Sequence, residues 1–385
     1  MQTLERIAQL VATPSVSAVR PELDMPNRAV IDLLATWAED AGFDVRVLPL
    51  VDDDGRELVG KANLIATRGR GPGGLVLAGH TDTVPFDEGK WRSDPFRLTE
   101  RDGRLYGLGS SDMKGFFALA LEAAERTKDV AHGEPLILLA TADEECGMDG
   151  ARALVRDGLP RARRAVIGEP TGLRPVRMHK GVSMERLRLD GRSGHSSNPA
   201  LGASALEGMR IAMNELVALR EELAARHRND ALVPPVPTMN LGNIHGGDNP
   251  NRICASCELQ FDLRVIPGMD ADVVRSELHQ RVARAVAGMG LTMDAAPLHL
   301  AVPPFETRAE ADIVRAAEEL TGHAAGAVAF GTEAPFLSAL GMDTIVLGPG
   351  DIDVAHQPDE FLPLERLTPC VELLERLIRR FCAAR

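Results

Sequence analysis

Three short apolar runs of the sequence end in side chains that bind metals or transfer protons in proteins. The runs occupy 75–80, 136–143 and 165–168, and their length and apolar character are typical of buried strands. At or just beyond their ends stand His80, Asp82, Glu144, Glu145 and Glu169. Because helix patterns separate the runs, we expect a parallel sheet, whose strands share one carboxyl edge where sites form.

Two further residues extend this set. Asp112 lies in GLGSSDMKG, just before a predicted helix, and His356 follows an apolar run that ends in GPG. Two imidazoles and three carboxylates are donors that zinc, cobalt and manganese bind. Two ions about 3.5–4 Å apart need a carboxylate between them. One carboxylate of Glu144 and Glu145 is then left over as a general base, and the spacing alone leaves both open.

The ordinary interpretation of each of these residues is a solvated or structural one. A single histidine is more often a surface or core residue than a ligand, and paired glutamates usually lie at a solvated strand end. The metal hypothesis is favoured because three separate apolar runs end in the same way.

The pattern of the chain changes near residue 182. Before that point helix and strand patterns alternate, whereas 182–297 has the order strand, helix, strand, strand, helix, strand of a ferredoxin-like α+β unit. The α/β pattern then returns. Helices are expected at 26–41, 115–128, 202–226, 270–288, 308–321 and 364–383. We therefore expect an α/β domain formed by 1–181 and 298–385 and interrupted by a smaller domain at 182–297.

Composition and charge exclude several classes of protein. The 385 residues carry a formal charge of −13 and their Lys and Arg residues are scattered, so no nucleic-acid partner is expected. The first residues lack the basic leader and apolar core of a signal peptide, and the apolar runs are too short to cross a membrane. Five cysteines over this length form no disulfide framework. We expect a cytoplasmic protein without a membrane partner.

Taken together, the motifs resemble those of the M20 metallopeptidase/deacylase family over essentially the whole chain. The matching segments are GHTDTVP (79–85), GLGSSDMKG (107–115), ATADEECGMDGA (140–151), IGEPTGL (167–173), GRSGHSSNP (191–199), NRIC (251–254) and AHQPDEF (355–361). Many members have two glycines after DMK, whereas here Gly115 is followed by Phe116. This form, with GTEAPF at 331–336, resembles the members that remove acetate from N²-acetyl-L-ornithine in arginine biosynthesis. Hydrolysis of another N-acyl amino acid, such as succinyl-diaminopimelate, or metal binding without catalysis are the alternatives.

The resemblance implies a fold, a metal site and an assembly. The fold is a catalytic domain with a mixed sheet between helices, interrupted by a ferredoxin-like lid domain through which two copies form a homodimer. The site holds two divalent ions, Zn²⁺ by preference and Co²⁺ as an alternative. His80 and Glu169 would bind one ion and Glu145 and His356 the other, with Asp112 bridging them.

The resemblance also implies roles for residues around the metals. Asp82 would orient the first of the two histidines, and Glu144 would be the general base. His195 would reach the active site of the partner subunit and help to hold the oxyanion of the transition state. Family members also have a cis peptide bond after the bridging aspartate, which here joins Asp112 and Met113.

An acetylated amino acid with a second amine needs two further kinds of contact. Its α-carboxylate needs donors, for which we predict Asn251 and Arg264. A surface ion pair with a neighbouring carboxylate is the alternative for Arg264, and the resemblance decides against it. The side-chain ammonium needs an acceptor, for which we predict Glu333, with Gly331 and Thr332 supplying backbone and hydroxyl groups nearby.

Overall fold

The chain forms two compact units. A computed structural model describes residues 2–52 and 54–384. The first unit contains the described residues up to 177, those at 307–326 and those from 332 onward, and the second contains 178–306 and 327–331. The second unit reaches beyond the predicted insert at 182–297, because His179 near its start pairs with Phe305 near its end.

The largest sheet has the strand order β1-β2-β6-β3-β7-β15-β8-β13, with β14 beside β8. The strands are β1 (Asp44–Val51), β2 (Glu57–Arg68), β3 (Leu75–His80), β6 (Leu136–Thr141), β7 (Arg164–Pro170), β8 (Val176–His179), β13 (Phe305–Glu306), β14 (Gly326–Val328) and β15 (Asp343–Gly348). The central strands β6, β3, β7 and β15 are parallel, and the strands toward both edges are antiparallel to their neighbours. The sheet is therefore mixed, which confirms the predicted α/β fold class.

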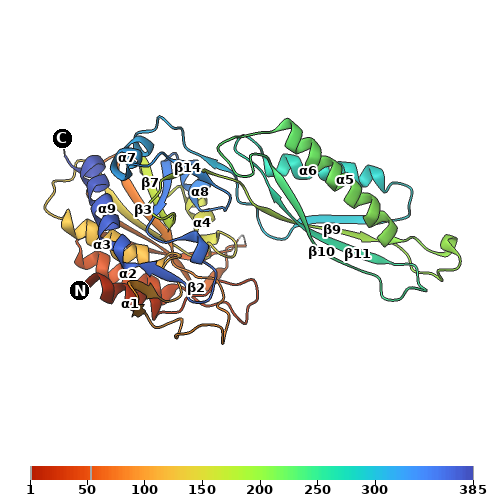
Figure 1. Ribbon diagram of the computed structural model, residues 1–385, viewed down its shortest axis with the longest axis horizontal. Helices are drawn as coiled ribbons and strands as arrows, with labels where there is room; N and C mark the ends of the chain where they lie inside the picture. Colours follow the sequence, from red (N-terminus) through yellow and green to blue (C-terminus); the bar gives the residue numbers. More distant parts are fainter. Residues whose placement is uncertain (1, 53, 385) are drawn as a thin grey trace. The chain divides into compact units, whose positions relative to one another are not determined.

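Helices cover both faces of this sheet within the first unit (Figure 1). On one face a single apolar core joins the sheet to α1 (Gln2–Val11), α2 (Arg28–Asp40), α3 (Lys114–Arg126), α7 (Asp312–Thr321) and α9 (Leu367–Cys382). The other face carries α4 (Asp149–Asp157) and α8 (Ala334–Ala339). β3 and β6 are buried along their whole length. Strands covered on both faces read as continuous apolar runs, which is why these two were predictable.

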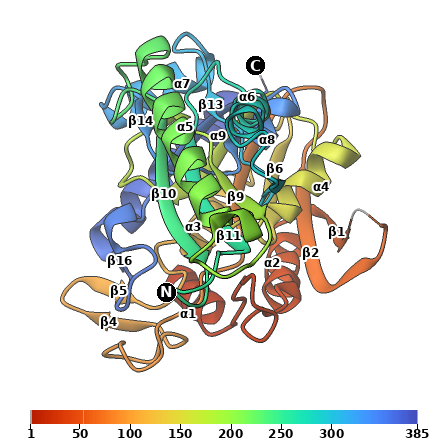
Figure 2. The same ribbon diagram turned by 90° about the vertical axis from the view of Figure 1, so that its right-hand side faces the viewer.

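The second unit is a four-stranded antiparallel sheet with two helices on one face (Figure 2). In chain order its elements are β9 (Ser183–Asp190), α5 (Ala205–Arg226), β10 (Thr238–Gly246), β11 (Ser256–Arg264), α6 (Ala271–Ala285) and β12 (Thr292–Pro297). The spatial order β10-β11-β9-β12 is that of a split βαβ unit. β11 alternates buried with half-buried residues, because only one face of this sheet is covered by helices.

A small third sheet in the first unit has the order β16-β5-β4. It consists of β4 (Thr99–Arg101), β5 (Arg104–Tyr106) and β16 (Phe361–Pro363). Short 3₁₀ turns occupy Ile352–Val354 and Leu364–Arg366 in the first unit and Pro199–Leu201 in the second. The pairing of β16 with β5 joins two segments that are far apart in sequence. Among the helices of the described residues, none has the length and apolar character needed to span a membrane.

Candidate metal centre

The register of the parallel strands brings their carboxyl ends to one edge of the large sheet. β3 pairs with β6 so that His80 lies opposite Thr141, and with β7 so that Ala78 lies opposite Ile167. The residues that follow these positions therefore lie at the same edge of the sheet. The predicted ligands gather there in overlapping clusters, namely His80, Asp112, Glu145, Glu169 and His356.

Asp112 stands between the two histidines. Its Oδ1 lies 3.2 Å from Nε2 of His80, and its Oδ2 lies 3.2 Å from Nε2 of His356. On the first side Glu169 Oε1 is 3.8 Å from the same His80 nitrogen, and on the second Glu145 Oε1 is 3.0 Å from that of His356. The geometry thus defines two clusters of one histidine and one glutamate that share an aspartate.

This donor set fits divalent metal ions. Within each cluster the ligand atoms lie within 4.8 Å of one another. Ring nitrogens and carboxylate oxygens are donors that zinc and cobalt accept, and a carboxylate with one oxygen toward each cluster can serve two ions. Glu144 forms a third cluster with His80 and Glu145, so the carboxylate left over by the two main clusters also stands at the centre.

The loop that carries Asp112 packs closely against its surroundings. The peptide bond between Asp112 and Met113 is cis, as the family resemblance implies. A Cβ on Gly115 would overlap the carbonyl oxygen of Ser110, so this position of the DMKG motif requires glycine. The following Phe116 lies against Gly168, where any side chain would overlap its ring.

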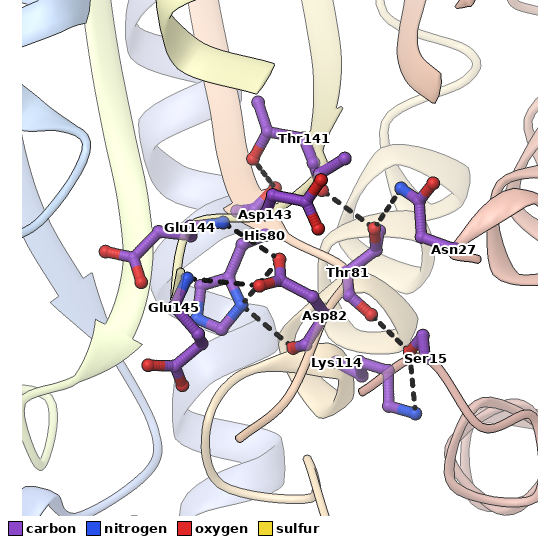
Figure 3. Close-up of polar contacts among 12 residues, drawn as sticks. Ser15, Asn27, His80, Thr81, Asp82, Lys114, Thr141, Asp143, Glu144 and Glu145 are labelled. Atoms are coloured by element: carbon purple, nitrogen blue, oxygen red, sulfur yellow. Dashed lines mark hydrogen bonds and ion pairs between the residues drawn. The ribbon is translucent and has the colours of Figure 1, made fainter. Parts of the chain in front are cut away.

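Asp82 supports the centre with two different groups. Its backbone carbonyl oxygen lies 3.0 Å from Nδ1 of His80, whereas its carboxylate lies 3.6 Å from that nitrogen. The carboxylate accepts hydrogen bonds from the backbone N–H groups of Glu144 at 3.2 Å and Glu145 at 3.1 Å (Figure 3). Asp82 therefore contacts His80 with its main chain and, as an ion pair, with its carboxylate, and the same carboxylate holds the backbone of the two glutamates.

A layer of polar side chains beneath His80 was not predicted from the sequence. Thr81 donates its hydroxyl to the carbonyl of Thr141 at 2.7 Å and accepts from the amide of Asn27 at 2.8 Å (Figure 3). The hydroxyl of Ser15 donates to the carbonyl of Thr81 at 2.6 Å, and Lys114 donates to Ser15 at 3.4 Å. These residues come from five separate segments, so no local spacing marks them. Their hydrogen bonds hold Thr81, which lies between His80 and Asp82 in the chain.

A buried ion pair holds the residue before Glu144. Nζ of Lys61 lies 2.7 Å from Asp143 and 2.9 Å from Asp24. Asp143 adopts φ 57°, a left-handed conformation that is uncommon for residues other than glycine. Burial and the nearby charge of Asp82 raise the pKa of Asp143 to about 6. The lysine contact therefore stabilises a strained turn directly before the two glutamates.

The centre concentrates negative charge in a buried place. Burial raises the pKa of Glu144 and Glu169 well above the ordinary value, and a nearby carboxylate adds to the shift in each case. Hydrogen bonds to Asp112 and Glu145 raise the pKa of His356 to about 10. Such a set of carboxylates is electrostatically unfavourable without added positive charge, which a divalent cation supplies.

Glu333 lies buried near this centre. It directly precedes α8 without a capping hydrogen bond from its side chain, and it is 1 % exposed. Burial raises its pKa to about 7, against a hydrogen bond with Thr141. Within the described part of the chain, Oε1 of Glu333 has no hydrogen-bond partner. The preceding residue, Thr332, is also buried. An acceptor atom of this carboxylate is therefore available to a donor from a ligand.

The remaining predicted residues belong to the second unit. The segments of His195 and Asn251 lie together, because the N–H of Ser196 donates to the carbonyl of Asn251 at 3.1 Å. Arg264, on β11, pairs with Asp262 at 2.8 Å, which is the surface ion pair weighed as the alternative for this residue. Gly331 also falls in this unit, whereas Thr332 and Glu333 belong to the first.

The mixed sheet carries at its edge histidine–carboxylate clusters that could hold divalent metal ions. The sequence matches the profile of Peptidase family M20/M25/M40 over residues 76–380. It is 46% identical over 381 residues to an acetylornithine deacetylase of Proteus mirabilis, covering 99% of this chain and 97% of that protein. It is also 46% identical to an acetylornithine deacetylase of Pasteurella multocida, covering 98% of each. The chain belongs to the M20 peptidase family.

Solved structures show the same fold. An M20 family metallo-carboxypeptidase of Sulfolobus solfataricus superposes with a TM-score of 0.77 at 18% identity, covering 98% of this chain and 99% of that one. An aminopeptidase of Bacillus cereus gives a TM-score of 0.73 at 20% identity, covering 98% and 97%.

Proposed function

We propose that this protein hydrolyses N²-acetyl-L-ornithine to L-ornithine and acetate, a reaction of arginine biosynthesis in the cytoplasm. The observation that carries the proposal is the 45–46% identity to three acetylornithine deacetylases over 98–99% of the chain. The histidine–carboxylate clusters supply the functional groups that amide hydrolysis needs.

We assign two divalent metal ions to the centre, Zn²⁺ first and Co²⁺ as the alternative. His80 and Glu169 would hold one, Glu145 and His356 the other, and Asp112 both. The position of Asp112 supports this assignment, since its two oxygens face different histidines. When bound, such ions lower the pKa of water and polarise a carbonyl group.

Glu144 is assigned the transfer of the proton. It stands at the centre without belonging to either of the two main clusters. A carboxylate at this position can take a proton from water and pass it to the departing amine. Asp82 holds the Glu144 backbone, which limits the positions that this carboxylate can reach.

We further propose that the second unit is a lid and dimerisation domain, and that His195 serves the partner subunit's site. Nδ1 of His195 accepts a hydrogen bond from the N–H of Ser197 at 3.2 Å. In the neutral ring the proton is then on Nε2, which can donate to an oxyanion. Mixing His195→Ala with Glu144→Gln subunits should restore activity, because one site of each mixed dimer has neither defect. Absence of recovery despite proven subunit exchange would exclude this role.

The substrate contacts follow from its charges. Asn251 and Arg264 supply donors for the α-carboxylate, and Glu333 accepts the side-chain ammonium, with Gly331 and Thr332 beside it. Two observations support Glu333: an unpaired Oε1 and burial that strengthens an ion pair once formed. For Arg264 the contact with Asp262 would have to be shared with the substrate or released.

Acetate release by the purified protein tests the proposal. Metal-free protein should be inactive, and addition of Zn²⁺ or Co²⁺ should restore hydrolysis of N²-acetyl-L-ornithine. Succinyl-diaminopimelate should react poorly. A preference for the succinyl compound would replace acetylornithine with the alternative substrate. Full metal binding without turnover of either compound would indicate that the protein binds metal but does not catalyse this reaction.

A further inference from the structure

Glu360 is a buried carboxylate that none of the assignments above uses. It lies four residues after His356, directly before β16, and is 2 % exposed. Its Oε2 accepts the N–H of Gly109 at 3.0 Å, and its Oε1 accepts the N–H groups of Ser111 at 2.8 Å and Asp112 at 3.0 Å. One side chain thus satisfies three main-chain donors of the loop that carries Asp112.

We propose that Glu360 is the positioning residue that fixes Asp112 for metal binding. The N–H group of Asp112 itself is bonded to Glu360, so the backbone from which the bridging side chain extends is held directly. Both carboxylate oxygens are acceptors here. With two acceptor atoms on one carbon, this side chain accepts from Gly109 with one oxygen and from Ser111 and Asp112 with the other. Charged acceptors also bind N–H groups more strongly than neutral ones.

Glu360 also joins the two loops that supply ligands to the same cluster. The carbonyl of Glu360 accepts the N–H of Gly107 at 3.1 Å, which extends the pairing of β16 with β5 toward the centre. A second contact between these segments runs from the N–H of Asp351 to the hydroxyl of Ser111 at 3.0 Å. Two connections thus join the segments of Asp112 and His356, whose side chains lie 3.2 Å apart, and one of them passes through Glu360.

A metal site needs this kind of support because coordination tolerates only small displacements of its ligands. Residues that orient ligands typically contribute 10–100-fold to metal affinity or activity. The inference rests on the proposed metal centre. A positioning role and a merely structural role of Glu360 predict different results, because loss of a structural residue would lower the stability of the fold without changing the affinity for metal.

The test is a Co²⁺ titration of the metal-free protein, followed by visible absorbance, in wild type and Glu360→Gln. Gln preserves the size of the side chain but replaces one acceptor by a donor. Glu134→Gln is the matched control, because that carboxylate also accepts a backbone N–H, from Gly74 at 2.8 Å, and it plays no part in the centre. We expect 10–100-fold weaker Co²⁺ binding in Glu360→Gln, wild-type binding in Glu134→Gln, and a lower thermal midpoint in both.

Activity provides a second measurement. At limiting Co²⁺ the kcat of Glu360→Gln should fall while KM for the substrate stays unchanged, and excess Co²⁺ should recover part of the loss. Wild-type Co²⁺ affinity in Glu360→Gln, with a thermal midpoint lowered as in the control, would overturn the proposal. Wild-type protein that binds no Co²⁺ would instead refute the metal centre itself. If Glu360→Gln does not fold, Glu360→Asp keeps the charge but shortens the reach, and wild-type affinity in that variant would equally overturn it.

Discussion

Replacement of Asp82 by Asn tests the role of its carboxylate, which accepts two backbone N–H groups and lies 3.6 Å from Nδ1 of His80. The substitution keeps the backbone carbonyl that lies 3.0 Å from Nδ1 of His80. It alters the carboxylate, whose two oxygens accept the N–H groups of Glu144 and Glu145 at 3.2 and 3.1 Å. Asn has one acceptor and one NH₂ group on that carbon, so one of these N–H groups must face a donor.

The size of the effect follows from the hydrogen bond that is lost. A hydrogen bond to a charged group contributes about 1.5–3 kcal/mol, and about 1.4 kcal/mol corresponds to a tenfold change in rate. Because the lost contact holds the backbone of the proposed base, we expect kcat for acetylornithine to fall roughly 10–150-fold. Affinity for Co²⁺ should change much less, since the contact between His80 and the carbonyl of Asp82 survives.

The assay combines initial rates of acetate release at saturating metal with a Co²⁺ titration of the metal-free variant. Asp312→Asn is the control, because that carboxylate is bonded to Arg164 on the far side of the unit from the centre. It should keep wild-type kcat. A kcat of Asp82→Asn within about twofold of wild type would refute the reasoning. Weakened Co²⁺ binding with normal kcat at saturating metal would show that the carboxylate acts on the ring of His80 instead.

Three further outcomes are expected. Glu144→Gln should retain metal while turnover falls roughly 10²–10⁴-fold, and near-normal turnover would remove Glu144 from proton transfer. Glu333→Gln should reduce hydrolysis of acetylornithine more than that of acetylmethionine, which has no side-chain ammonium; equal losses would argue against recognition by Glu333. The thermal midpoint of metal-free protein should fall as pH rises from 6 to 9. Folding raises the pKa of Glu333 from 4.5 to about 7 and that of His356 from 6.5 to about 10, so the folded state binds these protons more tightly and loses that advantage as pH rises. Within this window Glu333 alone corresponds to a loss of about 1.4 kcal/mol, because its contribution is lost only up to its folded pKa of about 7, and a flat or rising midpoint would contradict the assignment.

Periodic elements were predicted well because burial leaves a local pattern. The helices expected at 115–128 and 202–226 correspond to α3 and α5 within a few residues. The long strand β2 was not predicted, because polar residues interrupt its apolar pattern. Two of these, Lys61 and Asn63, are buried where Asp143 and the carbonyl of Gly150 provide partners. A buried polar residue resembles a surface residue in sequence when its partner is distant.

The sequence by itself determined which chemical groups meet at the edge of the sheet. Apolar runs that alternate with helix patterns favour parallel strands covered by helices, and parallel strands end on the same side. His80 and Glu169 were therefore expected at the same edge of the sheet, and the adjacency of β3 and β7 brings them close together. The order of elements in the second unit was determined in the same way, from alternation and helical periodicity.

Only the tertiary structure decided how these groups are oriented. It shows that the two oxygens of Asp112 face different histidines, and that Asp82 contacts His80 through its carbonyl while its carboxylate holds Glu144. It also reveals Glu360, whose hydrogen bonds span 248 to 251 residues of sequence. Such contacts depend on the direction of single hydrogen bonds between distant segments. Spacing along the chain carries no information about them, because each partner taken alone has an ordinary sequence environment.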